Sequence, residues 1–169
     1  SYNRITGLLL ERNIKESERH FHTVTLSLGR YVETYFDVYV NTPEILGLLK
    51  RAKYGFTVEK DIARVELFRK LFPLYKRMQN HGLRQLHFHT PDSRSFLRFH
   101  EPYLFGDTLT DVRPGVVKVN QILQSVSGFE SGKSLSGYRY IYPILDNGDH
   151  LGSVEFGISF EEIRENIAQ

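Results

Sequence analysis

The sequence predicts an α+β fold in which long N-terminal helices are followed by a five-stranded sheet. Two observations predict it: residues 2–82 carry apolar side chains at helical spacing, whereas residues 83–159 change to alternation broken by turn residues. A chain of 169 residues that is 40% hydrophobic can bury one core of ordinary size. We therefore expect a single domain over residues 1–169, with a helical part (1–82), the sheet (83–159) and the start of a C-terminal helix (160–169).

The first predicted helix covers residues 2–40. No proline interrupts this segment, and apolar residues recur three and four positions apart, for example at Phe21, Val24 and Leu28. A helix of this length would reach about 60 Å, roughly twice the diameter of a small domain. Part of it should therefore project from the globular body or pack along another chain. Its polar interval, residues 11–19, is either a solvated helix face or part of a stalk.

Two more helices are predicted before the sheet begins. Pro43 suits the first turn of a helix over residues 43–53. The next helical pattern covers residues 60–80, and Pro73 within it predicts a kink or a local end. Gly82 is the expected C-terminal stop.

The second half of the chain alternates between short apolar runs and turns. Five segments are predicted as strands: 83–90, 95–100, 126–131, 137–145 and 150–159. The run Asp-Asn-Gly-Asp before the last segment is a hairpin signal. A short helix is expected over residues 113–124. Ser159 followed by Glu162 is a capping-box pattern, which predicts that another helix starts at residue 160.

The first two strands, in the stretch "LRQLHFHTPDSRSFLRFH", concentrate histidine and arginine. With the turn centred on Asp92 and Ser93, side chains alternate so that one face is largely polar and the other apolar. The first face is expected to pair Gln85 with His100, His87 with Arg98, and His89 with Phe96. The opposite face collects Leu86, Phe88, Leu97 and Phe99.

The histidines allow two interpretations without an organic ligand. His87, His89 and His100 could bind zinc or another divalent metal, since His-x-His is a spacing that metal sites use. Against a metal, Arg98 would lie among these imidazoles, and a fixed cation beside a metal costs coordination energy. The histidines could equally serve as structural hydrogen-bonding groups.

Other classes of function find little support in the composition. The chain has no cysteine, which excludes disulfides, thiol nucleophiles and cysteine-ligated metals. Lysine plus arginine (22) nearly balances aspartate plus glutamate (20), so nucleic acid is not expected as the main partner. No serine lies in a nucleophile elbow, and the Gly-Lys-Ser run at 132–134 is interpreted as a glycine-rich turn between strands, not a phosphate loop.

The remaining interpretation is a binding surface for a small anion, because arginine offers a planar fork that fits a carboxylate. Later strands add further candidates: Tyr138 or Arg139, Tyr140, Tyr142, Glu130 and Glu155. The alternative is an ordinary half-exposed sheet whose polar face meets water.

The second half also resembles a known family. The segments "LRQLHFHTPDSRSFLRFHEP", "FGDTLTDVRPGVVKVNQ" and "VSGFESGKSLSGYRYIYPILDNGDHLGSVEFG" resemble the Cache-type, PAS-like extracytoplasmic sensor domain of bacterial transmembrane receptors. The resemblance implies a PAS-like, five-stranded antiparallel sheet, a long helix rising from one transmembrane segment and a last helix leading to a second. It also implies the periplasmic part of an inner-membrane chemoreceptor, sensor histidine kinase or diguanylate cyclase, with no catalysis and no cofactor in the domain itself.

In such domains the ligand lies between the sheet and the helices and loops that cover one face. By position, the resemblance makes these residues ligand-binding candidates: His87, His89, Arg98, Glu130, Tyr138, Arg139 and Tyr142. The expected partners are a small ligand such as a carboxylate, and a second copy of the chain packed through the N-terminal helix. The strand count predicts one module, so no two-module ligand motif is transferred. The rival hypotheses are a histidine-rich metal-binding domain or enzyme, and a protein-interaction module without a ligand.

Overall fold

A computed structural model describes residues 2–131 and 136–168 of the chain, and its α+β architecture confirms the predicted fold class. The Gly-Lys-Ser run at 132–134 lies outside the described residues. The elements in chain order are α1 (Tyr2–Tyr35), the π-helical turn η1 (Phe36–Val40), α2 (Pro43–Tyr54), α3 (Thr57–Gln79), β1 (Leu83–His89), β2 (Ser95–Arg98), α4 (Pro114–Ile122), β3 (Val126–Ser131), β4 (Ser136–Asp146), β5 (Asp149–Ser159) and α5 (Phe160–Ala168).

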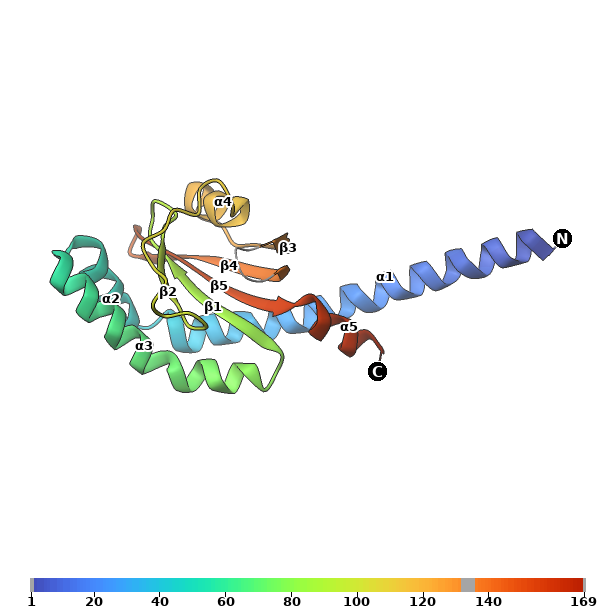
Figure 1. Cartoon of the computed structure of the whole chain (residues 1–169), viewed down its shortest axis with the longest axis horizontal. Coiled ribbons are helices and arrows are strands. Elements are labelled where there is room, and N and C mark those ends of the chain that lie inside the picture. The colour runs from blue at the N-terminus through green and yellow to red at the C-terminus, as the bar shows by residue number, and fades with distance from the viewer. Residues whose placement is uncertain (1, 132–135, 169) are drawn as a thin grey trace.

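The five strands form one antiparallel sheet in the order β2-β1-β5-β4-β3. Figure 1 shows α4 on one side of this sheet, while α1, α2 and α3 lie on the other side. The sheet is therefore the middle of three layers, with different surroundings on its two faces.

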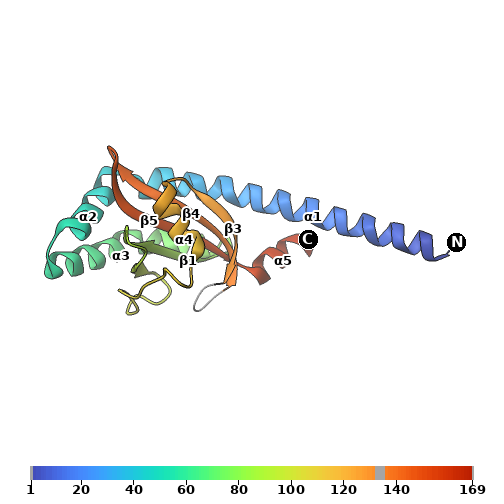
Figure 2. The same ribbon diagram turned by 90° about the horizontal axis from the view of Figure 1, so that it is seen from above.

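Helix α1 projects far beyond the sheet, as its length predicted (Figures 1 and 2). Every residue from 2 to 20 is exposed, and burial begins only near Thr25 and Val32, where the helix reaches the sheet. The predicted end near residue 40 is also found, but the last turn is π-helical. In that turn the Phe36 ring stacks on Tyr142 of β4, with ring centroids 4.7 Å apart.

Helix α3 differs from its prediction at both Pro73 and its start. It begins at Thr57, three residues earlier than expected, and continues through Pro73 without ending. The local end was therefore wrong, although the ribbon of α3 bends along its length in Figure 1. Leu71, Leu74 and Met78, on both sides of the proline, are all buried, so packing against the sheet offsets the one hydrogen bond that proline removes.

The β1–β2 hairpin keeps one predicted pair and shifts the others. His87 faces Arg98 as predicted, but a bulge after Phe88 places His89 opposite Ser95 instead of Phe96. The turn is wider than expected because the Thr90 amide donates to the Arg94 carbonyl. Phe96 consequently joins the apolar cluster on the helical side of the sheet.

The predicted pair of Gln85 with His100 was wrong for a simpler reason. Strand β2 ends at Arg98, so His100 lies beyond the pairing, and Gln85 instead faces Gly157 of β5. The predicted apolar face of this hairpin is confirmed, since four side chains join the main core: Leu86, Phe88, Leu97 and Phe99.

The last hairpin and helix follow their sequence signals. Asn147 (φ 49°) and Gly148 (φ 85°) both have positive φ, as a tight hairpin of this type needs. The Glu162 amide donates to Ser159 Oγ at 3.2 Å, which is the predicted cap of α5. Because α5 follows β5 without a loop and packs on α1, a movement of β5 would reach both terminal helices.

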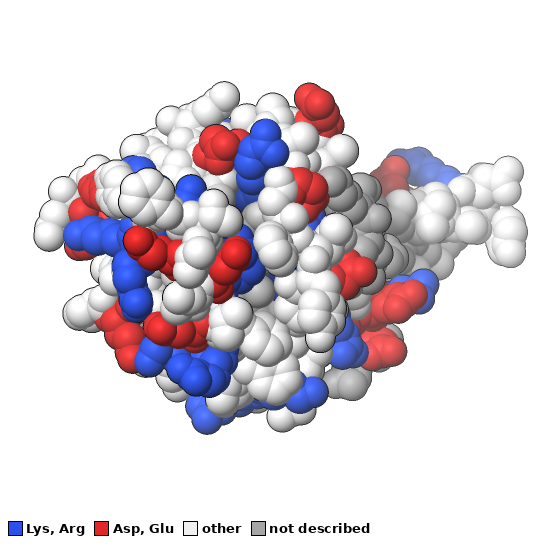
Figure 3. Space-filling model, turned by 60° about the vertical axis from the view of Figure 1, so that its left-hand side comes forward, with Lys and Arg blue, Asp and Glu red and all other residues white. Residues whose placement is uncertain are grey.

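The surface carries charges of both signs side by side. On the face seen in Figure 3, lysine and arginine alternate with aspartate and glutamate around uncharged residues. Among the residues that the structure describes, no helix combines the length and the hydropathy that a membrane crossing needs.

Candidate functional site

The sheet face beneath α4 is polar and yet almost completely buried. Cross-strand register puts Gln85, His87 and His89 of β1 opposite Gly157, Glu155 and Ser153 of β5, and residues paired in this alternation share one face. Each of the five side chains among them that could hydrogen-bond is at most 5% exposed. Burying such polar groups costs free energy unless each has a hydrogen-bond or ion-pair partner.

Arg113 and Glu155 form the centre of this face. Arg113 lies directly before α4, and its Nη1 donates to Glu155 Oε1 at 2.7 Å while Nη2 donates to Oε2. Its Nε donates to Glu130 Oε1 at 3.0 Å. Burial alone would raise the pKa of Glu155, but the hydrogen bonds from Arg113 and His87 hold that pKa well below its usual range. Glu155 is therefore a buried carboxylate that stays ionised.

Two histidines of β1 flank the same carboxylate. His87 Nδ1 lies 3.1 Å from Glu155 Oε1, and its Nε2 lies 2.8 Å from Ser95 Oγ. His89 Nδ1 lies 2.8 Å from Ser153 Oγ. Burial lowers the pKa of His87 to about 3 and also lowers that of His89, so both imidazoles are neutral near pH 7.

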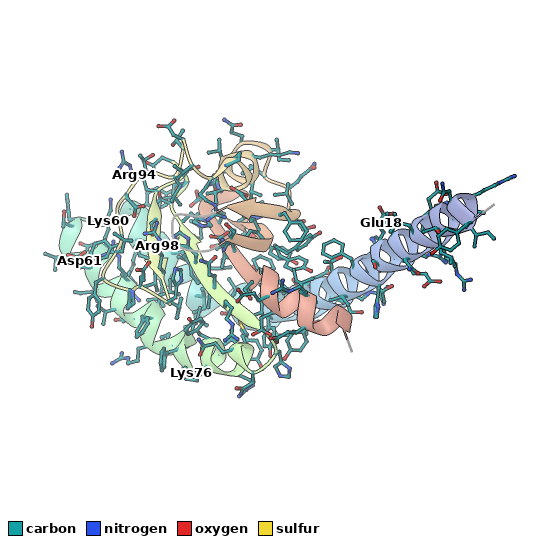
Figure 4. All side chains as sticks on the ribbon, turned by 45° about the vertical axis from the view of Figure 1, so that its right-hand side comes forward. Glu18, Lys60, Asp61, Lys76, Arg94 and Arg98 are labelled. Carbon is teal, nitrogen blue, oxygen red and sulfur yellow. The ribbon has the colours of Figure 1, made fainter. Side chains whose placement is uncertain are left out.

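Arg98 secures the loop that covers the sheet between β2 and α4. It donates to both carboxylate oxygens of Asp107, at 2.7 and 2.8 Å, and to the carbonyl of Leu104 at 2.7 Å. Figure 4 labels Arg98 among the strands, whereas Arg94 lies at the edge of the molecule. The guanidinium of Arg98 is thus committed to holding this loop in place.

Beside this network, a cavity of about 260 Å³ opens between α4 and strands β3 and β4. Both Glu130 and Arg139 line it, together with Gly115 and Lys118 of α4. A side chain at Gly115 would meet Glu130 Oε2 at 2.4 Å, so the glycine lets the start of α4 approach this carboxylate. Gly157 has a similar role, because a Cβ there would meet Arg139 Nη1 at 2.7 Å.

The structure brings together five of the seven predicted ligand-binding residues on the polar face: His87, His89, Arg98, Glu130 and Arg139. Tyr138 and Tyr142 lie on the opposite face, because they alternate with Arg139 along β4. Tyr138 packs edge-on against Phe21 of α1 with centroids 6.0 Å apart. The two tyrosines therefore contact the helical layer and do not line the cavity beneath α4.

Arg113 and Asp107 belong to the polar face but were not predicted. Both come from the segment between β2 and α4, whose path over the sheet depends on tertiary contacts. One clue was available for Arg113, since it precedes Pro114, and a proline at the first helical position places the preceding residue at the helix start. His100, the third histidine of the metal hypothesis, is replaced by Glu155 in the group that converges with His87 and His89.

Comparison with known proteins relates the chain to sensory domains. The model of the family described as "Double sensory domain of two-component sensor kinase" matches residues 58–169. The comparison with curated proteins gives no match.

Solved sensor domains share the fold. The Escherichia coli DcuS sensor domain is 15% identical with a TM-score of 0.57, and the match covers 90% of this chain and 98% of that one. The Vibrio cholerae histidine kinase DctB sensor domain is 15% identical with a TM-score of 0.68, and the match covers 96% of this chain and 60% of that one. The Campylobacter jejuni chemoreceptor Tlp3 sensory domain with isoleucine bound is 12% identical with a TM-score of 0.51, over 95% of this chain and 65% of that one. The chain thus spans less than two thirds of the DctB and Tlp3 domains.

Proposed function

The chain belongs to the family of double sensory domains of two-component sensor kinases, and we propose that it is one ligand-sensing module of a transmembrane receptor. The resemblance to a Cache-type sensor domain is confirmed by this family and by the fold. The matched domains are sensory and not catalytic, and we propose accordingly that residues 1–169 form a single sensor domain without enzymatic activity.

The cavity beneath α4 is the observation that carries the proposed ligand site. Its volume of about 260 Å³ suits a molecule of a few carbon atoms. Arg139 is 2% exposed and lines the cavity, so a carboxylate there would meet a guanidinium held in a region of low dielectric. Small organic acids and amino acids both carry a carboxylate. The structurally similar chemoreceptor Tlp3 has been crystallised with isoleucine and with L-valine.

In this proposal the predicted candidates have different roles. Arg139 and Glu130 would contact the ligand, because both line the cavity. Arg98 would act through the covering loop, since Asp107 and Leu104 already accept its hydrogen bonds. His87 and His89 would not contact the ligand and would hold the buried polar side chains next to the cavity in place. Tyr138 and Tyr142 would not contact this ligand, because they pack against Phe21 and Phe36 on the other face of the sheet.

The route from ligand to output would pass along β5. Glu155 lies five residues before the start of α5, and α5 packs on α1. A ligand that fits one position of α4 better than another would shift the packing of these two terminal helices, by no more than its difference in affinity for the two arrangements.

The receptor setting is also a proposal. We infer a periplasmic location, attachment to the inner membrane through segments outside this chain, and a homodimer formed through α1. The exposed apolar side chains on the projecting half of α1 support the dimer: Ile5, Leu8, Leu9, Leu10 and Ile14.

A thermal-shift screen with small organic acids and amino acids tests the ligand site. A ligand at about 100 times its Kd would add about 2.7 kcal/mol of stability, which is roughly 5–10 °C in Tm for a domain of this size. Arg139→Gln should abolish the shift, whereas Arg69→Gln, at an exposed position on α3, should leave it intact. A screen in which no acid or amino acid raises Tm at millimolar concentration would contradict the proposal.

A further inference from the structure

Three potential metal ligands, His87, His89 and Glu155, converge at one buried point on the polar face and do not line the cavity. His87 Nδ1 lies 3.1 Å from Glu155 Oε1, and His89 Nε2 lies 3.5 Å from the same oxygen. The three donor atoms all lie within 4.8 Å of one another, and all three residues are buried. They come from the adjacent strands β1 and β5, so their positions are fixed by the sheet itself.

These separations fit tetrahedral coordination. With metal–nitrogen and metal–oxygen bonds of about 2.0–2.1 Å, neighbouring ligand atoms of a tetrahedral zinc site lie about 3.3 Å apart. Both measured separations from Glu155 Oε1 are within a few tenths of an ångström of that value. An ion bound to Glu155 Oε1 and to one nitrogen of each histidine would therefore need little change in these two separations.

The outer nitrogen of each histidine already has an orienting partner. Ser95 Oγ lies 2.8 Å from His87 Nε2, and Ser153 Oγ lies 2.8 Å from His89 Nδ1. If these outer nitrogens carry the protons, the serine oxygens accept from them and the inner nitrogens present their lone pairs to the centre. Metal-binding histidines are typically oriented by such a second hydrogen bond.

His89 Nε2 provides the independent indication that the arrangement lacks a component. Within residues 2–131 and 136–168, this buried nitrogen has no hydrogen-bond partner. His89 is only 3% exposed, and a buried polar atom without a partner costs free energy that native structures rarely accept. The nitrogen faces the same carboxylate oxygen that His87 contacts.

We propose that His87, His89 and Glu155 form a binding site for a divalent transition-metal ion such as Zn²⁺. Two imidazoles and one carboxylate are the ligand types of many zinc sites, and coordination positions remain for water or for the sensed molecule. This proposal goes beyond the organic-ligand site and does not depend on it.

Arg113 is the competitor that this site must accommodate. Its guanidinium donates to both oxygens of Glu155, and a second cation nearby weakens metal binding. The metal ion would bind Oε1 of Glu155, and Oε2 would still accept a hydrogen bond from Arg113. Arg113 would also retain its hydrogen bond to Glu130. The ion would thus displace one hydrogen bond between the start of α4 and the sheet.

Calorimetric titration of the tag-free, chelator-treated protein with Zn²⁺ tests the site. We expect one equivalent to bind, and His89→Ala to weaken binding at least tenfold. Ser153→Ala should also weaken it, because outer-shell partners typically contribute tenfold or more. His100→Ala and His22→Ala are matched controls that should bind as the unaltered protein does.

Co²⁺ absorption gives a readout that needs no altered protein, since tetrahedral coordination produces strong visible bands. Such bands with one equivalent of Co²⁺, displaced by Zn²⁺, would support the site. Absence of stoichiometric metal binding would overturn it, and so would a loss of binding in His100→Ala with none in His89→Ala. Failure here would leave the organic-acid screen with Arg139→Gln unaffected, so the two proposals fail separately.

Discussion

The two faces of the sheet are buried to a similar degree but are stabilised in different ways. The face against α1, α2 and α3 is held by apolar area, with Phe88, Val154 and Phe156 all fully buried. The face under α4 has only a small apolar cluster, made by Leu109, Val116, Val119 and Ile141. It also buries charges, and Arg113, Glu155 and Arg98 each depend on named partners. An apolar face tolerates replacement of one apolar side chain by another of similar volume. A buried ion pair loses much of its contribution to stability when either partner is removed.

Removing one member of the central ion pair should have the largest effect. Arg113→Met leaves the fully buried Glu155 carboxylate without its main partner, which should cost about 3–5 kcal/mol of unfolding free energy. Urea denaturation measures this loss.

The double variant Arg113→Met/Glu155→Leu sharpens the contrast. Replacing both charges by apolar groups removes the uncompensated charge and should recover most of the lost stability. If the double variant is as unstable as the single one, an unpaired charge is not the cause of the lost stability. The two faces would then not differ in the way proposed.

A cavity on the apolar face should have the next largest effect. Leu67→Ala removes a fully buried side chain of α3 and should cost about 2–4 kcal/mol. Val65→Ala on the same helix is the control, because Val65 is 66% exposed and should change stability by less than about 0.5 kcal/mol. Similar losses in both variants would show that α3 is not held by its buried face.

The apolar face was also the more predictable of the two. Periodicity alone identified the buried sides of α1 and β1, because a helical or alternating pattern of apolar residues has one physical solution. The bulge after Phe88 could not be read from this pattern, and it moved Phe96 to the helical side and Ser95 to the polar side.

The polar face could be predicted only in part. Alternation grouped His87 with Arg98, and this pair is found. Glu130 and Arg139 were named as candidates on the later strands, but no register that would bring them to the same face could be read from the sequence. Arg113 and Asp107 could not be placed, because residues 99–113 form no strand or long helix and can cross a sheet in many ways. Alternation along β4 places Tyr138 and Tyr142 on the face opposite Arg139. The sequence did not indicate which of the two faces would bind a ligand.

Weakening the Arg98 fork should have an intermediate effect. Arg98→Lys keeps the charge but loses the paired hydrogen bonds to Asp107, and should cost about 1–2 kcal/mol. Hydrogen exchange of residues 99–113 should become faster, since this loop loses its main attachment. Arg12→Lys is the control: Arg12 pairs with Glu16 on the exposed part of α1, and the change should have little effect on either measurement.

The smallest effect on folding and the largest on association should come from the projecting half of α1. Leu8→Ser/Leu9→Ser changes two side chains that are 58% and 54% exposed, so the stability of an isolated chain should change by less than about 1 kcal/mol. If a second copy packs on this helix, the same change removes apolar contact from the interface and should shift the dimer toward monomer in sedimentation velocity. Tyr103→Ser is the matched control, because Tyr103 is 95% exposed on the loop between β2 and α4, where it lies beside Arg64 and Phe68 of α3. A sedimentation profile that responds to Tyr103→Ser and not to the leucine change would place the contact between copies beside α3 and would contradict a dimer formed through α1.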